Sequence, residues 1–282
     1  MDWLYIPTNT PAIPCGRCVA PISGPSGGTV DRDLFRVQVM RKTKKFSPGE
    51  RSLFGLSRSK LENFMNCPRC FYLDRRLGIE PPSGPPFSLN LAVDHLLKKE
   101  FDDCRARGVP HPYIAQAGLY AIPYSDARMD DWRNNFKGVR VAHKASGFEV
   151  YGAVDDLWFD RQSGEVIVTD YKATAKDGEV GLDADWQISY KRQIEVYQWL
   201  LRRNSLKVAD TGYFVYCNGD RSRSDFGGVM QFSVKVIPYT GDDTWVEDAL
   251  LNARRCLDGE LPESTPNCKQ CAYLSDVKAM GI

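Results

Sequence analysis

Two aspartates and one lysine, Asp155, Asp170 and Lys172, occur in a part of the chain that predicts two antiparallel strands, residues 148–159 and 165–172. Both segments are rich in β-branched and aromatic residues, and a short polar turn separates them. With that turn at the centre, Asp155 and Asp170 face each other, and directly opposed residues have Cβ atoms roughly 4.5–5.5 Å apart. Side-chain alternation places Lys172 on the same face as Asp170. Two carboxylates this close usually share a cation or a proton, because their charges repel when poorly solvated.

The alternative is a solvated hairpin face on which these charges are incidental. The surroundings of the two aspartates favour a site instead. Asp170 follows the apolar run Val166–Val168, and Asp155 lies within Ala153–Leu157, so both strands are expected to be largely buried. We therefore expect a carboxylate–carboxylate–lysine site.

A long amphipathic helix is predicted over residues 185–203, where Gln193 and Tyr197 are spaced i, i+4. Both lie on the apolar stripe of this helix. The stripe also contains Trp186, Tyr190, Leu200 and Leu201, and the opposite side contains Lys191, Arg192, Glu195 and Arg202. A glutamine on an inward stripe needs hydrogen-bond partners. Gln193 is therefore a candidate for supporting the site, and the alternative is an ordinary core amide.

Four cysteines form two pairs at the ends of the predicted ordered region, Cys67-x-x-Cys70 and Cys268-x-x-Cys271. One such pair is a weak signal, but two pairs that bracket a single fold indicate a shared site. Four thiolates suit a tetrahedral Zn²⁺ or a [4Fe–4S] cluster. Unligated thiols are the remaining alternative.

Residues 1–50 differ from the rest of the chain. They contain several prolines, a Gly/Ser-rich patch and the basic run Arg36–Lys45, without apolar periodicity. We expect a flexible extension there, and a single α/β domain over residues 51–282. The pair Cys15-x-x-Cys18 in this extension has no obvious partners and is interpreted as incidental.

Helix and strand signals on either side of the hairpin complete the predicted core. Ser59 with Glu62 forms a capping box that predicts the start of a helix. Pro68 opens a second short helix that Gly78 can close. Further helices are predicted from Ser88 to about Arg107 and near 244–257, and further strands near 211–217 and 229–237. Residues 109–147 are predicted to be rich in loops.

The 282-residue chain carries 37 basic and 36 acidic residues, so its formal net charge is +1. This balance neither supports nor excludes a nucleic-acid substrate, because such an enzyme can gather its cations around a groove. No stretch approaches the roughly 18 consecutive apolar residues of a membrane span, and the N-terminus lacks an apolar signal core. We expect a soluble, cytoplasmic protein that does not associate with membranes. In a reducing compartment, its cysteines are thiols or metal ligands rather than disulfides.

Three ordered motifs carry a resemblance to a known family: Gly152-Ala-Val-Asp155, Asp170-Tyr-Lys172 and Gln193-Ile-Glu-Val-Tyr197. Their order and spacing resemble the PD-(D/E)XK nucleases of the RecB type. The segment from Ser57 through Cys67-Pro68 to Leu73 is similar to the N-terminal segment of the same group, which includes CRISPR-associated exonucleases and AddB helicase–nuclease subunits. The resemblance covers about residues 56–275.

This resemblance implies a restriction-endonuclease-like core, in which helices flank a central mixed β-sheet and a cysteine-ligated metal site joins the N- and C-terminal segments. It also implies that Asp155 and Asp170 bind Mg²⁺ or Mn²⁺ and that Lys172 orients or activates the attacking water. Gln193 and Tyr197 would support the lysine and the substrate backbone. Phosphodiester hydrolysis needs a metal-held hydroxide and a cation near the charge that develops on phosphorus. Hard divalent cations prefer the oxygen ligands that aspartates supply.

The resemblance also bears on the cysteines. Several RecB-type nucleases carry a [4Fe–4S] cluster that joins the N-terminal helices to the C-terminal tail. We therefore expect a [4Fe–4S] cluster at Cys67, Cys70, Cys268 and Cys271, with Zn²⁺ as the alternative. The usual family arrangement has one cysteine upstream and three downstream, whereas this sequence has two and two.

The family usually adds a histidine from an upstream helix, in a Gly-x-x-x-His pattern with an apolar residue three positions later. Two residues are candidates here, Asp94 and His95. Asp94 has the apolar spacing, to Leu97, although Asn90 replaces the glycine. Asp94 also lies nearer than His95 to the apolar stripe of Leu89, Val93, Leu96, Leu97 and Phe101. We predict Asp94 as the third metal ligand, with His95 as the alternative.

The expected function is metal-dependent hydrolysis of DNA phosphodiester bonds by an exonuclease or single-strand-acting nuclease in repair, recombination or defence. The expected partners are DNA, single-stranded or at ends, and a helicase or defence complex. The aromatic and basic residues from Trp186 to Arg192 would contact bases and phosphates, unless they form an ordinary amphipathic face. The alternative is a non-cleaving nucleic-acid-binding subunit with a structural four-cysteine metal site. The intact Asp155, Asp170 and Lys172 argue against it, because binding alone does not need them.

Overall fold

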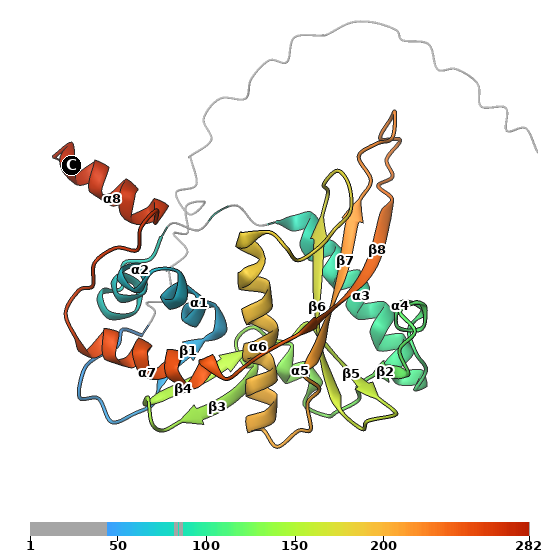
Figure 1. The fold of residues 1–282 in the computed structure, drawn as a ribbon, viewed down its shortest axis with the longest axis horizontal. Coiled ribbons are helices and arrows are strands. Elements are labelled where there is room, and N and C mark those ends of the chain that lie inside the picture. Colours follow the sequence, from blue (N-terminus) through green and yellow to red (C-terminus); the bar gives the residue numbers. More distant parts are fainter. Residues whose placement is uncertain (1–43, 82–83, 85–86, 282) are drawn as a thin grey trace, which may run out of the picture. The chain divides into compact units, whose positions relative to one another are not determined.

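The computed structural model describes residues 44–81, 84 and 87–281. This part of the chain combines two β-sheets with helices that pack around them (Figure 1). Cys15 and Cys18 lie outside the described residues. Among the helices of the described part, none is long and apolar enough to cross a membrane.

The larger sheet has five strands in the order β2 (Ala121–Pro123), β5 (Asp156–Asp160), β6 (Val166–Thr174), β7 (Thr211–Gly219) and β8 (Phe232–Thr240). Neighbouring strands are antiparallel except β6 and β7, which are parallel. A parallel pair needs a crossover connection, and helix α6 (Ile188–Arg203) lies in that connection. The predicted α/β core with a mixed sheet is confirmed in this outline.

The side chains of β6 alternate between two hydrophobic cores, one on each face of the sheet. Val168 belongs to the core that contains Ile194 of α6. Ile167 belongs to the core that contains Phe101 of α3 (Ser88–Arg107). Even-numbered positions of β6 therefore face α6, and odd-numbered positions face α3. Figure 1 shows the two helices flanking the central strands.

The smaller sheet has the order β1 (Phe54–Ser57), β4 (Phe148–Gly152) and β3 (Val139–His143). Strand β1 is parallel to β4, and β3 is antiparallel to it. Helix α1 (Arg58–Asn66) follows β1 directly, and Ser57 Oγ caps it by accepting from the Lys60 N–H at 3.3 Å. The predicted capping box at Ser59 is therefore wrong by two residues, because the helix begins where the strand ends.

The predicted strand over 148–159 is two strands, β4 and β5, which belong to different sheets and are separated by residues 153–155. The prediction of one strand is therefore wrong at the position that matters most, since Asp155 lies in the break. The predicted register of the hairpin is confirmed, because Leu157 pairs with Val168 and Asp156 pairs with Thr169. Continuing this register by one residue brings Asp155 opposite Asp170.

Helices at both ends of the domain pack together. The predicted helix from Pro68 to Gly78 consists of α2 (Pro68–Tyr72) and a π-helical turn, η2 (Leu73–Leu77), and Gly78 ends it with a φ of 75°. Two helices follow the larger sheet, α7 (Trp245–Asp258) and α8 (Lys269–Ala279). Both contact α2, so the first and last parts of the described domain are neighbours.

Residues 109–147 are less loop-rich than predicted. They contain β2, β3 and two short helices, α4 (Pro112–Gln116) and α5 (Met129–Trp132). None of these elements exceeds five residues. Elements this short have too few positions for a recognisable period, so their pairing in space defines them.

The predicted apolar stripe of α3 is correct only in part. Leu97 and Phe101 are buried, whereas the side chains of Leu89 and Leu96 are 54% and 57% exposed. The core on this face includes Leu97 and Phe101, and Val93 packs against it.

The stripe predicted for α6 is wrong at two positions. Trp186, in the short helix η3 (Asp185–Gln187), is 60% exposed, although it was expected to face inward. Glu195, predicted on the charged side, is buried. Its carboxylate accepts hydrogen bonds from Tyr239 Oη and, at 2.7 Å, from Trp245 Nε1, so β8 and α7 cover that side of the helix as well.

Residues 44–50, the end of the predicted extension, are described, and Phe46 is part of the core. Its ring packs edge-on against Phe54 with 5.4 Å between centroids, and the Arg254 guanidinium lies 4.9 Å from its centroid. The Phe46 N–H donates to the carbonyl of Arg75 at 2.8 Å. The packed domain therefore includes residues before the predicted boundary at 51.

Candidate active site and four-cysteine site

Asp170 and Lys172 lie on the α6 face of β6, two positions apart. Asp170 is completely buried, and 14% of the Lys172 side chain is exposed. The two side chains form an ion pair. Both Asp170 oxygens are buried without a hydrogen-bond partner of good geometry among the described residues. A buried carboxylate with free lone pairs is costly, so this position is suited to binding a cation.

Asp155 reaches the same place from the break between β4 and β5. Its Oδ2 accepts a hydrogen bond from the Tyr171 backbone N–H at 3.0 Å, and 24% of its side chain is exposed. Gly152 permits this arrangement, because a Cβ there would lie 2.6 Å from Cε1 of Tyr197. The glycine at the start of the Gly152–Asp155 motif thus allows the chain to pass close to α6 before Asp155 turns toward β6.

The charges of the three residues influence one another. Burial raises the pKa of Asp170 to about 7; the charge of Lys172 opposes this shift and that of Asp155 adds to it. Burial would lower the pKa of Lys172, but the charges of Asp170 and Asp155 raise it above its ordinary value. Lys172 is therefore a charged ammonium at neutral pH, suited to orienting an oxygen atom or stabilising negative charge.

Gln193 and Tyr197 continue from Lys172 along α6. Lys172 Nζ donates to Gln193 Oε1 at 3.3 Å, and Gln193 Nε2 donates to Tyr197 Oη at 3.3 Å. Burial raises the pKa of Tyr197, so its hydroxyl stays protonated. The structure thus brings together the aspartates, Lys172, Gln193 and Tyr197. The amide of Gln193 has two partners in this chain and fixes the position of the Lys172 ammonium.

Asp94, on α3, lies on the other side of Asp155. Burial raises the pKa of Asp94, and the charge of Asp155 raises it further. His95, the next residue in the chain, is exposed. Asp94, Lys172 and Tyr190 line the same cavity of about 100 Å³. Of the two candidates for a third ligand, the structure therefore places Asp94 at the site and His95 away from it.

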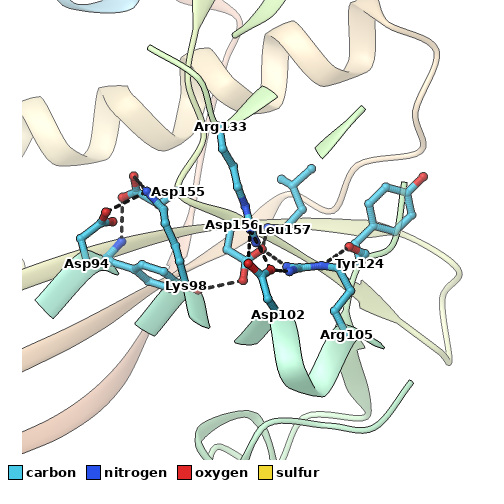
Figure 2. A network of polar contacts seen from close by, with 10 residues as sticks. Asp94, Lys98, Asp102, Arg105, Tyr124, Arg133, Asp155, Asp156 and Leu157 are labelled. Atoms are coloured by element: carbon cyan, nitrogen blue, oxygen red, sulfur yellow. Dashed lines mark hydrogen bonds and ion pairs between the residues drawn. The ribbon is translucent and has the colours of Figure 1, made fainter. Parts of the chain in front are cut away.

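Lys98 was not among the predicted site residues. Its Nζ lies 2.9 Å from Asp94 Oδ2 and 3.7 Å from Asp155 Oδ1, and Figure 2 shows it between the two carboxylates. Among the residues that the structure describes, no three carboxylates bring oxygen atoms within 4.8 Å of one another. The i, i+4 spacing of Asp94 and Lys98 predicts the contact between these two residues. Only the tertiary structure shows that the Lys98 ammonium also lies close to Asp155.

Asp156 belongs to a second network, on the α3 face. It is completely buried and forms ion pairs with Arg105 and with Arg133, the latter at 2.7 Å (Figure 2). Tyr171 Oη donates to its Oδ2 at 2.7 Å, and its Oδ1 accepts from the Leu157 N–H at 2.8 Å. This network holds Asp156 and Tyr171, the residues that directly follow Asp155 and Asp170. The arginine partners of Asp156 come from α3 and from the residue after α5, and they were not predicted from the sequence.

The four cysteines come together at the first turns of α2 and α8. Cys67 and Cys268 are the residues immediately before the two helices, and Cys70 and Cys271 lie within the first turns. The four sulfur atoms all lie within 4.8 Å of one another. The predicted shared site is therefore present as a group of thiols that joins residues near both ends of the domain.

The distances between these sulfur atoms suit a single small ion. Three of the six pairs lie at 3.8 Å (Cys67–Cys271), 3.5 Å (Cys70–Cys268) and 3.5 Å (Cys70–Cys271), and the others lie within 4.8 Å. Four thiolates at about 2.3 Å from one tetrahedral Zn²⁺ lie roughly 3.8 Å from one another. Burial would raise the pKa of the Cys67 thiol, but hydrogen bonds with the backbone of Thr265 and Cys70 lower it to about 6.

The fold and the Asp–Asp–Lys arrangement are consistent with a nuclease. The family model of the PD-(D/E)XK nuclease superfamily matches residues 55–275, and the chain belongs to this superfamily. Among individually curated proteins, none matches the chain. The α/β architecture with mixed sheets is consistent with a restriction-endonuclease-like fold.

Proposed function

We propose that this protein is a divalent-metal-dependent nuclease of the RecB type that hydrolyses DNA phosphodiester bonds at Asp155, Asp170 and Lys172. The observation that supports it most is the completely buried Asp170, whose two oxygens lack good hydrogen-bond partners in the described structure and whose neighbours are a second carboxylate and an ammonium. A nucleic-acid-binding module has no use for such a costly arrangement.

Asp155 and Asp170 are the residues that would hold Mg²⁺ or Mn²⁺, because these ions prefer carboxylate oxygens. When bound, the metal ion supplies an activated hydroxide and polarises the phosphate. The Tyr171 N–H fixes one oxygen of Asp155, which leaves the other for the ion. Asp94 is the third candidate ligand, and it becomes available when Lys98 releases it.

Lys172 acts on the reacting groups through its charge. It remains protonated at neutral pH, so its ammonium donates hydrogen bonds to the attacking oxygen or to the phosphate rather than removing a proton. Gln193 keeps the ammonium in place, and Tyr197 holds Gln193 in turn. Fixed donors aimed at developing charge contribute more in a site that excludes water.

We further propose that the four cysteines hold one Zn²⁺, instead of the [4Fe–4S] cluster favoured by the family resemblance. Four sulfur atoms that all lie within 4.8 Å of one another, with three pairs at 3.5–3.8 Å, fit ligands of one tetrahedral ion. In a [4Fe–4S] cluster each thiolate binds a separate iron atom, so the four sulfurs stand further apart. The ion would fasten α2 to α8 and close a loop that contains most of the domain, which stabilises the fold.

Cleavage of labelled DNA tests the proposal directly. Single-stranded and double-stranded DNA are incubated with the full chain in Mg²⁺, in Mn²⁺ and in EDTA, and end-labelled and internally labelled substrates separate exonuclease from endonuclease action. We expect cleavage that requires the metal ion. Binding of DNA without cleavage in either metal would support the alternative, a non-cleaving subunit that acts with a helicase or defence complex.

A further inference from the structure

Two aromatic rings lead from the catalytic lysine to the solvent. The Tyr190 ring lies 4.4 Å from Lys172 Nζ and lines the same cavity as Asp94. Trp186 packs edge-to-face on Tyr190, with 5.3 Å between centroids, and is 60% exposed. An exposed tryptophan that packs on a residue of the candidate active site leaves an apolar ring surface available to a ligand.

The position of Trp186 is fixed by its neighbours. Gln187 Nε2 donates to the carbonyl of Gly181 at 2.6 Å, and its Oε1 accepts from the Ala184 N–H at 3.0 Å. Gln187 is buried, so these bonds fasten the segment before α6. Tyr190 packs in turn against Phe214 of β7 at 6.4 Å between centroids. A ring held in this way loses little conformational entropy when a ligand stacks on it.

A larger groove is lined by Gln187 and Lys191, the residues that follow Trp186 and Tyr190 in the chain. Its volume is about 590 Å³, and its charged lining residues are Lys176, Lys191 and Lys235 together with Glu179 and Asp183. Lys235 pairs with Glu179 at 3.1 Å, whereas Lys176 and Lys191 form no ion pair with any described residue. The chain as a whole has a net charge of only +1, so two unpaired lysines in one groove form a local site for an anionic chain.

We propose that Trp186 stacks on an unpaired base next to the scissile phosphate and that Tyr190 supports its ring edge-to-face, while Lys176 and Lys191 contact the phosphates beyond it. The nucleic acid that these residues bind is therefore single-stranded DNA. In a duplex the bases stack on one another and are not accessible to a side-chain ring, whereas single strands are held by aromatic stacking together with a basic groove. This inference rests on the proposed nuclease function, because it places the base by reference to Lys172.

Binding in EDTA tests the stacking without cleavage. Fluorescence anisotropy measures the affinity of the full chain and its variants for labelled oligothymidylate and for a blunt duplex. Stacking contributes about 1–3 kcal/mol per base, so Trp186→Ala should weaken single-strand binding between about 5-fold and about 150-fold. Duplex binding should change little. Trp186→Phe should retain most of the affinity, and Phe136→Ala, which removes another highly exposed ring, serves as the control.

The salt dependence of binding tests the groove. Each single-strand phosphate that a lysine neutralises contributes about 0.7 to the slope of log affinity against log salt. Lys191→Gln should reduce the slope for oligothymidylate by about that amount. Lys144→Gln, in the turn between β3 and β4 of the smaller sheet, is the matched control and should leave the slope unchanged.

The results separate this inference from the proposed function. If Trp186→Ala binds oligothymidylate as the unchanged chain does, or loses duplex and single-strand binding equally, the stacking proposal is overturned even when the unchanged chain cleaves DNA. If Trp186→Ala selectively loses single-strand binding and the unchanged chain cleaves nothing, the stacking proposal stands and the nuclease proposal fails. An unchanged salt slope for Lys191→Gln overturns the role given to the groove.

Discussion

The ammonium of Lys98 lies 3.7 Å from Oδ1 of Asp155, one of the two carboxylates that would hold the metal ion. It also contacts Asp94 at 2.9 Å, so one lysine of α3 neutralises part of the candidate site. A divalent ion that binds Asp94 and Asp155 must compete with this positive charge.

We predict that Lys98→Met binds Mn²⁺ more tightly than the unchanged chain. Removing the ammonium leaves two carboxylates uncompensated, and a gain of about 1.4 kcal/mol corresponds to about tenfold in affinity. Isothermal titration calorimetry measures the affinity and the stoichiometry. Lys99→Met changes the adjacent, exposed lysine and should have no effect. Equal or weaker Mn²⁺ binding by Lys98→Met would contradict this role and indicate that Lys98 supports the site.

The catalytic assignment predicts that Asp170→Asn and Lys172→Ala lose cleavage while the chain still folds. Removing one group that stabilises the transition state lowers the catalytic rate roughly 10²–10³-fold. The rate is measured on labelled DNA in Mg²⁺, and circular dichroism checks the fold. Asp130→Asn, an exposed carboxylate in the first turn of α5, is the control. Substantial cleavage by folded Asp170→Asn would remove the proposed site.

Metal affinity should depend on pH because burial raises the pKa of Asp170 to about 7. The ion binds the deprotonated carboxylate, so a proton must leave whenever the pH is below this value. We expect the affinity for Mn²⁺ to rise by about tenfold per pH unit below pH 7 and to level off above it. Titrations between pH 5.5 and 8.5 measure this, with Asp170→Asn as the reference. An affinity that does not change over this range would argue against Asp170 as a ligand.

The four-cysteine site predicts one bound zinc ion per chain. Elemental analysis should find zinc, and the protein should lack the broad visible absorption of thiolate-ligated iron. Cys70→Ser or Cys271→Ser should release the metal and lower the melting temperature, since the metal–ligand bonds contribute to folding. Cys256→Ser changes a partly buried thiol outside the site and is the control. Iron with sulfide would restore the cluster expected from the family resemblance, and metal-free protein of unchanged stability would contradict both.

Phe46 tests where the packed domain begins. Because its ring is buried against Phe54 and Arg254, Phe46→Ala should cost about 3–5 kcal/mol of unfolding free energy. Phe46→Leu should cost much less, since it fills most of the space. Urea unfolding of both variants measures the difference. Equal stability of Phe46→Ala and the unchanged chain would show that residues before 51 add nothing to the core.

The sequence alone was sufficient for the features that depend on local periodicity and spacing. Side-chain alternation predicts that Lys172 shares a face with Asp170, and the short turn predicts the register that brings Asp155 opposite Asp170. The i, i+4 spacing of Gln193 and Tyr197 predicts their common side of α6. These features follow from the geometry of a single strand, hairpin or helix, so neighbouring residues determine them.

Only the tertiary structure decided the features that join distant segments. The break at residues 153–155, the exposure of Trp186, the burial of Phe46 and the arginine partners of Asp156 all depend on which surfaces pack against one another. Lys98 reaches Asp155 because α3 lies beside the sheet, and no local pattern contains that contact. Burial and charge compensation arise from packing between elements far apart in the chain, so periodicity within one element cannot reveal them.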